Sequence, residues 1–292
     1  MPKTRTATKP PSKKPAGAAP KKATRAGRAR DGAAAETPSR SKGTAAAKKP
    51  APAPGKSAPA PFEGFPKDFH AFFRELAKHN EREWFQANKD RYLGSVLAPM
   101  VSFIAAMDLP LGRVADCFVA DARTNGGSMF RIYRDTRFSH DKTPYKTHAA
   151  CHFRHEAGKD AHAPGFYVHL EPTRVFFGGG LWHPPGPELR KLREAIAEDP
   201  DRWIAITKAP AFRRRFGEVR GDALKRPPQG FDPDHRLVEE LKRTSYFAIQ
   251  EAPPAVILTK DFVRDVARCF EAMAPFMEFL TGALGLPFHR ED

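Results

Sequence analysis

The residues that could do chemistry are concentrated in one block of this 292-residue chain, residues 131–148. The block contains three arginines, two lysines and two aspartates. Arginine binds phosphate or carboxylate through two parallel hydrogen bonds, and lysine adds a point charge. Because the five cations exceed the two carboxylates, we expect the block to bind an anion, namely a phosphate or a nucleic-acid backbone. The expected ligand-binding residues are Arg131, Arg134, Arg137, Lys142, Tyr145 and Lys146, with His183 from a later turn.

A purely structural role for this block stays open. Asp135 and Asp141 can pair with the arginines, and ion pairs of this kind often hold a geometry without binding a ligand. The loop would then be a salt-bridge network that fastens it to a sheet, and the chain would be a scaffold. The excess of cations favours the anion site over this alternative.

A second group of polar side chains follows an alternating stretch of sequence. Tyr167, His169 and Glu171 fall on one face of a predicted strand. A His–Glu pair on a strand can orient an imidazole for general acid–base catalysis, and His183 could approach the pair from a glycine-rich turn. The same alternation is typical of a strand whose polar face meets solvent, which is the preferred interpretation.

An enzyme that acts on an anionic substrate is the alternative function. Carboxylates near a lysine suit metal-dependent phosphodiester hydrolysis, although no spacing in the chain requires this chemistry. No GxSxG motif marks a nucleophile, no cofactor is predicted, and whether the chain is an enzyme is left open. The candidate catalytic residues are Asp135, Asp141, Lys142, His169 and Glu171.

Three histidines are spaced so that they would share one face of a helix: His148, His152 and His155. Imidazoles grouped in this way can bind zinc. Residues 148–154 are predicted to form a strand, however, beside the strand at 166–171. A strand leaves His148 and His152 on one face and turns His155 away, so no metal site is predicted.

The sequence of the block, RIYRDTRFSHDKTPYKTH, resembles the signature of the uncharacterised family DUF2461. Its signature segments at 134–139 and 141–146 are both intact, and His140 between them lies at a position that varies in the family. The resemblance extends over nearly all of residues 62–292 and implies that this stretch is a single family domain. It implies no activity. Further matching segments are 62–73, 167–172, 179–184 and 225–235.

Residues 1–61 differ in composition from the rest of the chain. They hold 15 basic and two acidic residues, a net charge of +13, and eleven prolines, but no Val, Ile, Leu, Phe, Trp, Tyr or Cys. Such a segment cannot bury enough apolar surface to fold and is predicted to be a disordered basic tail. We expect this tail to contact nucleic acid or another polyanion by releasing counterions, and an inert linker is the alternative.

The composition of the core restricts its partners and its compartment. Residues 62–292 carry 34 basic and 32 acidic residues, a net charge of +2. This small excess favours the scaffold, since nucleic-acid domains usually carry a larger basic excess. A phosphorylated small molecule is the candidate partner of the core.

No apolar run predicts a transmembrane helix or a secretory signal, and no membrane partner is expected. Three cysteines without CxxC spacing are typical of a reduced cytoplasmic protein.

The elements that position these residues follow from apolar periodicity. Phenylalanines and a leucine at 69–76 predict an N-terminal helix. A capping box that begins at Asn80 opens a second helix, which Pro99 should kink or split. Short helices are predicted within 189–241, and a long C-terminal helix ends at Gly282.

Strands occupy the middle of the chain and its last third. They are predicted at 117–120, 130–133, 148–154, 166–171, 175–177 and 246–249, with the glycine run at 178–180 ending the fifth. Helices that flank a block of adjacent strands indicate an α+β fold with a central, mostly antiparallel sheet.

Overall fold

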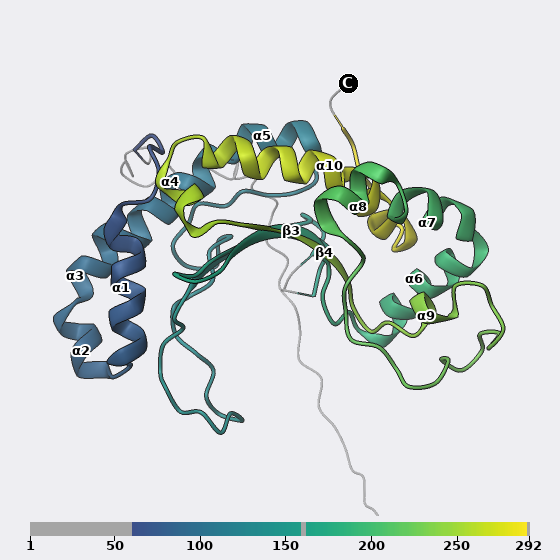
Figure 1. Ribbon diagram of the computed structural model, residues 1–292, viewed down its shortest axis with the longest axis horizontal. Helices are drawn as coiled ribbons and strands as arrows, with labels where there is room; N and C mark the ends of the chain where they lie inside the picture. Colours follow the sequence, from purple (N-terminus) through teal and green to yellow (C-terminus); the bar gives the residue numbers. More distant parts are fainter. Residues whose placement is uncertain (1–59, 159–161, 291–292) are drawn as a thin grey trace, which may run out of the picture. The chain divides into compact units, whose positions relative to one another are not determined.

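The computed structural model describes residues 60–158 and 162–290, so all but the last two residues of the predicted tail lie outside the described part. The fold is α+β, as predicted. A four-stranded antiparallel sheet is flanked by helices from the N-terminal and C-terminal parts of the described chain (Figure 1).

The strands of the sheet are arranged in chain order. Cys151 lies opposite Val168, Val168 lies opposite Phe177, and each strand runs antiparallel to the next. Short connections join the first three strands, and a group of helices precedes the fourth. The strands are β1 (Ala149–Arg154), β2 (Gly165–Leu170), β3 (Val175–Leu181) and β4 (Tyr246–Ala252).

One face of the sheet packs against the long C-terminal helix α10 (Phe262–Ala283) (Figure 1). Phe153, Phe166 and Phe177 come from three neighbouring strands, and all three are buried. The ring of Phe270 in α10 stacks on Phe166 with the centroids 4.5 Å apart. Apolar residues at every second strand position therefore form the core, as the alternation predicts.

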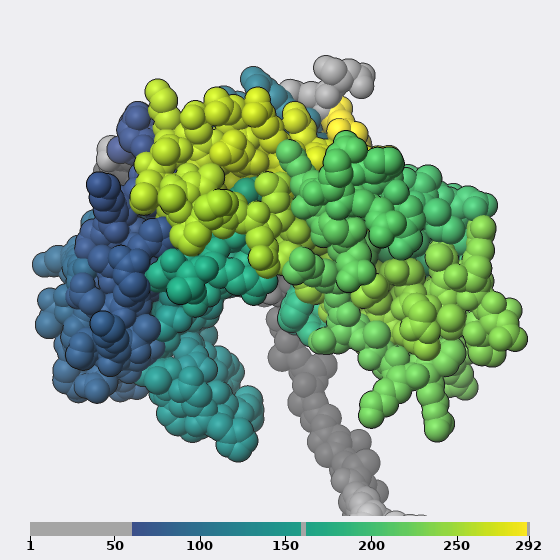
Figure 2. Space-filling model, in the orientation of Figure 1, coloured from purple at the N-terminus to yellow at the C-terminus, as the bar shows by residue number. Residues whose placement is uncertain are grey.

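The opposite face of the sheet is called the open face here. Among residues 60–158 and 162–290, no helix runs across it (Figure 1). Figure 2 shows the molecule hollowed beneath it, between the purple-to-blue N-terminal helices and the green helices that precede β4. Alternate side chains of all four strands therefore face this hollow.

The N-terminal helix forms as predicted. α1 (Lys67–Lys78) begins directly after Pro66, and its apolar stripe is buried. The predicted capping box is wrong, because α2 (Arg82–Ala87) has no side-chain cap. Asn80 instead exchanges two hydrogen bonds with the backbone of Tyr145, at 2.9 and 3.0 Å, which fastens the end of the 131–148 block to the turn between α1 and α2.

The second predicted helix is broken into several pieces. Pro99 is tolerated because it lies in the first turn of α4 (Ala98–Ala106), where its missing N–H is not needed. The turn just before it widens to a π-helix, η1 (Leu93–Leu97), as happens where the regular hydrogen-bond ladder is interrupted. The other pieces are α3 (Lys89–Tyr92) and α5 (Asp108–Val114).

A cluster of short helices covers the end of α10 that lies beside β4. Trp203 and Phe212 from two of these helices contact the ring of Phe276, with centroid separations of 5.8 and 5.6 Å. The helices are α6 (Gly186–Glu198), α7 (Pro200–Thr207), α8 (Pro210–Phe216) and α9 (Val238–Leu241), and a 3-10 turn, η2 (Pro254–Leu258), follows β4.

Three strand predictions are wrong in their extent. Residues 117–120 and 130–133 form only isolated bridges, such as Phe118 with His155 and Tyr133 with Tyr145, because they lie at the margin of the sheet. The glycine run does not end the fifth predicted strand, and β3 continues through it to Leu181. A Cβ at Gly178 would lie 2.0 Å from the Ala248 carbonyl oxygen, so glycine there allows β4 to approach.

In the described part of the chain, no single helix is long and apolar enough to cross a membrane. The segments 89–106 and 108–114, bent by 42°, satisfy the length and composition requirement only when taken together.

Candidate functional site

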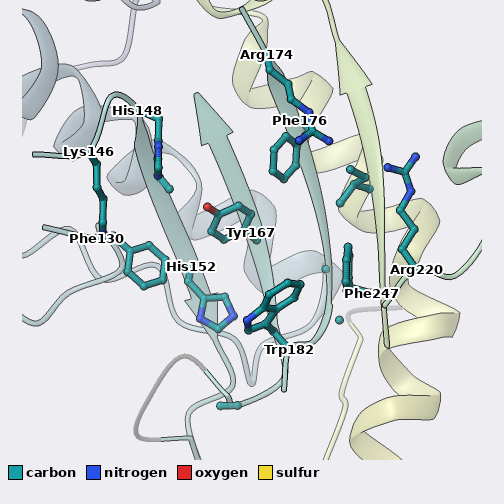
Figure 3. A pocket seen from close by; sticks show the side chains of 16 residues that line it. Phe130, Lys146, His148, His152, Tyr167, Arg174, Phe176, Trp182, Arg220 and Phe247 are labelled. Atoms are coloured by element: carbon teal, nitrogen blue, oxygen red, sulfur yellow. The ribbon is translucent and has the colours of Figure 1, made fainter. Parts of the chain in front are cut away.

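The open face of the sheet lines a cavity of about 570 Å³, which we call the sheet cavity. Its size is in the range that holds a small-molecule ligand. Seven of the sixteen lining residues carry a ring, and Figure 3 shows these rings projecting toward one shared space from the four strands and from segments beside them. These rings belong to Phe130, His148, His152, Tyr167, Phe176, Trp182 and Phe247.

Strand alternation and register bring these side chains together. Every second residue of a strand points to the same face, and the residues directly opposite on the neighbouring strand point with it. His152 of β1 therefore lies opposite Tyr167 of β2, while His169 of β2 lies opposite Phe176 of β3. The prediction that His148 and His152 share a face while His155 turns away agrees with this register, because His155 is fully buried and bonded to the Pro287 carbonyl oxygen at 3.0 Å.

Side chains stack in a row across the open face. The rings of His148 and His169 have centroids 4.3 Å apart, and those of His169 and Phe176 are 4.6 Å apart and nearly parallel. The Arg174 guanidinium lies 4.6 Å from the Phe176 centroid on the same strand, within the distance of a cation–π contact. The row fixes the orientation of the imidazoles.

The histidines of this face are neutral near pH 7. Burial lowers the pKa of His148, His152 and His169 to about 4 in each case. Neighbouring groups make a smaller contribution to these lowered pKa values: the imidazole of His169 acts on His148, and Arg154 and Arg174 act on His152 and His169. Neutral imidazoles add flat, weakly polar surface to the wall and offer a ring nitrogen to a ligand.

Tyr167, His169 and Glu171 form a hydrogen-bonded chain. The Tyr167 hydroxyl is 3.2 Å from Nδ1 of His169, and Nε2 of His169 is 3.4 Å from Oε2 of Glu171. A carboxylate only accepts hydrogen bonds, so in this arrangement Nε2 donates to Glu171 and Nδ1 accepts from Tyr167. Burial raises the pKa of the Tyr167 phenol, which keeps its proton. Tyr167 lines the sheet cavity and the His169 side chain is only 12% exposed, so this polar face is more enclosed than a flat strand surface in solvent.

Three cations surround the aromatic wall. Arg174 and Arg220 both approach Glu251, at 2.9 and 4.0 Å, so one carboxylate serves two guanidinium groups. Lys146 is different: its Nζ donates to the Arg131 carbonyl oxygen at 3.0 Å and lies 5.3 Å from the Phe130 ring centroid. Within the described ranges no carboxylate lies within ion-pair distance of Lys146. Burial, and then the charge of Arg131, lowers its pKa.

Residues 131–146, which we call the signature loop, pair most of their charges internally. Arg134 donates to Asp141 and Thr143, and Arg137 reaches Asp135 at 2.7 Å. The Arg137 guanidinium is the main cause that lowers the pKa of Asp135 to about 2. Hydrogen bonds from the Thr143 amide and from Arg134 lower that of Asp141 to about 2.

The other proposed ligand residues are placed in different surroundings. Lys142 donates to the Thr136 carbonyl oxygen at 2.8 Å, and the buried ring of Tyr145 stacks on Phe85 with centroids 4.2 Å apart. His183 lies beside Asp222, with Nε2 3.6 Å from its carboxylate, rather than beside His169.

The candidate catalytic residues are divided between two places. Asp135, Asp141 and Lys142 belong to the exposed signature loop, whereas His169 and Glu171 belong to the sheet. No hydrogen bond or ion pair within residues 60–158 and 162–290 joins the two sets. The structure therefore does not assemble these five residues into one site.

Several cavity residues were missed by sequence reasoning. Phe176 lies within the predicted strand 175–177, and Trp182 continues the same alternation one residue after β3 ends, so the alternation could have indicated both. Arg174 directly precedes that strand. Arg220 and Phe247 gave no such signal, because a single bridge between residues 27 positions apart brings Arg220 beside Phe247 at the edge of β4.

One group of side chains has the spacing of metal ligands. Potential ligand atoms of Asp116, Cys117 and His289 all lie within 4.8 Å of one another. Cys117 already donates to Asp116 at 3.2 Å, and burial raises its pKa, which opposes formation of the thiolate that a metal requires. This group is accounted for by its own hydrogen bonds.

Comparison with known proteins supports the family resemblance. A family model described as "Conserved hypothetical protein (DUF2461)" matches residues 68–279, a range that includes the whole sheet, the signature loop and every residue of the sheet cavity. A search of curated proteins found none that matches.

Proposed function

The chain belongs to the DUF2461 family, whose description assigns no activity, and we propose from its own residues that it binds a small organic anion in the sheet cavity. The observation that carries this proposal is Lys146, a partly buried ammonium beside the aromatic wall with no carboxylate partner in the described part of the chain. A half-buried charge of this kind gains most when a ligand supplies the opposite charge.

The wall of the sheet cavity supports a ligand with a flat apolar body. Five aromatic side chains and two neutral imidazoles line it, and each offers a face or an edge to a ring. The polar groups that could orient the ligand are few: the Tyr167 hydroxyl, imidazole nitrogens of His148 and His152, and the cations at the rim. A mostly apolar cavity with a few convergent polar groups is typical of a small-molecule site.

Electrostatics support placing the ligand's negative group beside Lys146. Arg131 lowers the pKa of Lys146, which means that the two cations repel each other. An anion between them would relieve that repulsion and restore the affinity of Lys146 for its proton. At the other rim, Glu251 already compensates Arg174 and Arg220 in part.

Titration calorimetry with full-length protein would test this proposal. The probes are aromatic carboxylates and aromatic phosphate esters, each paired with an uncharged analogue. We expect at least one anion to bind, and Lys146→Met to weaken that binding about tenfold or more, since a hydrogen bond to a charged group contributes about 1.5–3 kcal/mol. Lys191→Met, an exposed lysine of α6, is the matched control. Unchanged affinity in Lys146→Met, or no binding of any anion, would contradict the proposal.

Catalysis on the bound anion is the second candidate function. The observation that favours it is the Tyr167–His169–Glu171 chain, which connects a hydroxyl of the cavity wall to a carboxylate through an imidazole. Such a chain can move a proton to or from a bound ligand. His169→Gln is expected to abolish turnover of a bound probe while its Kd changes less than threefold, and turnover that survives this substitution would exclude the role.

The N-terminal tail has a separate proposed role. Residues 1–61 carry a net charge of +13, and we propose that they contact nucleic acid or another polyanion. We place the protein in the cytoplasm, because Cys117, Cys151 and Cys269 are buried and unpaired, as expected in a reducing compartment.

A further inference from the structure

A second, smaller cavity adjoins the sheet cavity. Its volume is about 230 Å³, and we call it the loop cavity because residues 124–131 form most of its wall. Phe130 and His152 line both cavities. Their rings are nearly parallel, with centroids 6.3 Å apart. The two cavities therefore share a wall at this pair of rings, next to Lys146, which lies over Phe130.

The lining of the loop cavity is basic. It includes Arg131 and Arg154 and contains no carboxylate. Arg131 is exposed, and within the described ranges no acidic side chain lies within ion-pair distance of it. Lys146 lies over Phe130 and Arg131 follows it in the chain, and in the part that the structure describes neither cation has an acidic side chain within ion-pair distance.

Backbone amides add hydrogen-bond donors to the same wall. The N–H groups of Thr124 and Asn125 donate to no acceptor among the described residues, whereas the Gly127 amide closes the hydrogen-bonded turn at 124–126. Consecutive unpaired amides of a tight turn form a concave surface that suits an anion. Amides together with the Arg131 guanidinium provide several donors, which suits a tetrahedral phosphate better than a single donor would.

The turn that carries these amides is held in one conformation. Ser128 donates its amide to the Asp121 carbonyl oxygen at 2.7 Å, and its Oγ accepts from the Asp121 amide at 2.9 Å. Gly126 adopts a φ of +72°, in the left-handed region that favours glycine. A Cβ at Gly127 would lie 2.3 Å from the Arg123 carbonyl oxygen. The amides are therefore presented by a turn that needs little ordering when a ligand binds.

We infer that the two cavities together bind a nucleoside 5′-monophosphate. The base lies in the sheet cavity against its aromatic wall, the sugar passes Phe130 and His152, and the phosphate lies in the loop cavity. This inference rests on the proposed function, which requires only an organic anion, and it adds that the anion is a phosphate monoester attached to a base. The neutral imidazoles and the Tyr167 hydroxyl supply donors and acceptors for the edge of the base.

Calorimetric titration of full-length protein with AMP, GMP, CMP and UMP tests the inference. Each nucleotide is paired with its nucleoside, and inorganic phosphate is titrated alone. We expect at least one monophosphate to bind at least tenfold more tightly than its nucleoside. Arg131→Gln is expected to remove most of that preference while leaving the affinity for the nucleoside within twofold of the wild type. Arg264→Gln on α10 is the matched control. The Arg264 guanidinium lies 3.3 Å from the Asp261 carboxylate, and Arg264 lines neither cavity.

The outcomes separate the inference from the proposed function. Equal binding of nucleotide and nucleoside, or a full phosphate preference in Arg131→Gln, overturns the phosphate site in the loop cavity. Binding of aromatic carboxylates without any nucleoside monophosphate overturns the inference and leaves the proposed function standing. If no anion of either panel binds, both are wrong. The melting temperature of Arg131→Gln is measured in parallel, and we expect no change because the side chain is exposed.

Discussion

The histidines of the open face couple the stability of the protein to pH. Burial lowers the pKa of His148, His152 and His169 to about 4, whereas an unperturbed histidine in the unfolded chain has a pKa of about 6.5. Between these values the unfolded chain binds more protons than the folded one. The stability that the neutral imidazoles contribute is therefore fully present above about pH 6.5 and is lost as the pH falls toward 4.

His152→Gln tests this linkage, because glutamine does not titrate. In the wild type we expect the free energy of unfolding to fall between pH 7 and pH 4.5. In His152→Gln we expect that fall to be smaller by about 2 kcal/mol, the contribution of one such group. Urea denaturation at the two pH values measures the difference. His79→Gln, an exposed position, should leave the fall unchanged. An equal fall in wild type and His152→Gln would show that His152 is not the group responsible.

The charged residues of the signature loop divide into two kinds. Asp141 forms an ion pair with Arg134, and Asp135 forms one with Arg137. Both carboxylates are exposed, so these ion pairs contribute little to stability. This pairing supports a structural role for Arg134 and Arg137. Arg131 and Lys146, at the two ends of the loop, have no such partners in the described part of the chain and are the residues on which both binding proposals depend.

At the scale of elements, β3 decides the form of the open face. Its glycines bring β4 close, and this places Phe247 beside Gly180. Gly180 has a φ of +149°, and a Cβ there would lie 2.2 Å from the Tyr246 carbonyl oxygen. Any side chain at this position would therefore separate β3 from β4 and disturb the floor of the sheet cavity.

Gly180→Ala is expected to destabilise the protein by about 2 kcal/mol or more, because it combines backbone strain with a backbone clash. Gly186→Ala is the matched control: Gly186 is the first residue of α6, and a Cβ there meets no atom within 4 Å. That change should be neutral or stabilise by about 0.5 kcal/mol. Chemical denaturation measures both variants, and equal stabilities would refute the role of Gly180 in strand pairing.

At the scale of the whole molecule, the chain combines a nearly neutral core with a strongly basic N-terminal segment. If residues 1–61 bind a polyanion, affinity for single-stranded DNA should fall linearly with the logarithm of the salt concentration. Replacing the lysine pairs at 13–14, 21–22 and 48–49 by glutamine removes six charges and should reduce that slope by about 4. Fluorescence anisotropy across a salt series measures it. A slope that does not change would assign the binding to the core.

Local pattern predicted much of the secondary structure. The apolar stripe of α1, the hairpin of β2 and β3, the strand before it and the C-terminal helix all follow from periodicity over a few residues. The wrong predictions occur where a contact with a distant segment of the chain determines the local conformation. Asn80 bonds to Tyr145, 65 residues away, instead of capping its own helix. The glycine run resembles a strand end but lies inside a strand, because β4 approaches it closely.

The sequence alone determined the family, the α+β class with its antiparallel sheet, and the concentration of charge in residues 1–61 and 131–148, because these depend on composition, order and short-range periodicity. Only the tertiary structure decided which charges are compensated and which are not. It pairs Arg134 and Arg137 within their own loop, leaves Lys146 beside an aromatic wall, and brings Arg220 and Phe247 to the same cavity across long stretches of chain. Such contacts depend on how strands and helices pack in three dimensions. The spacing of residues along the chain predicts local elements but not which distant elements pack together.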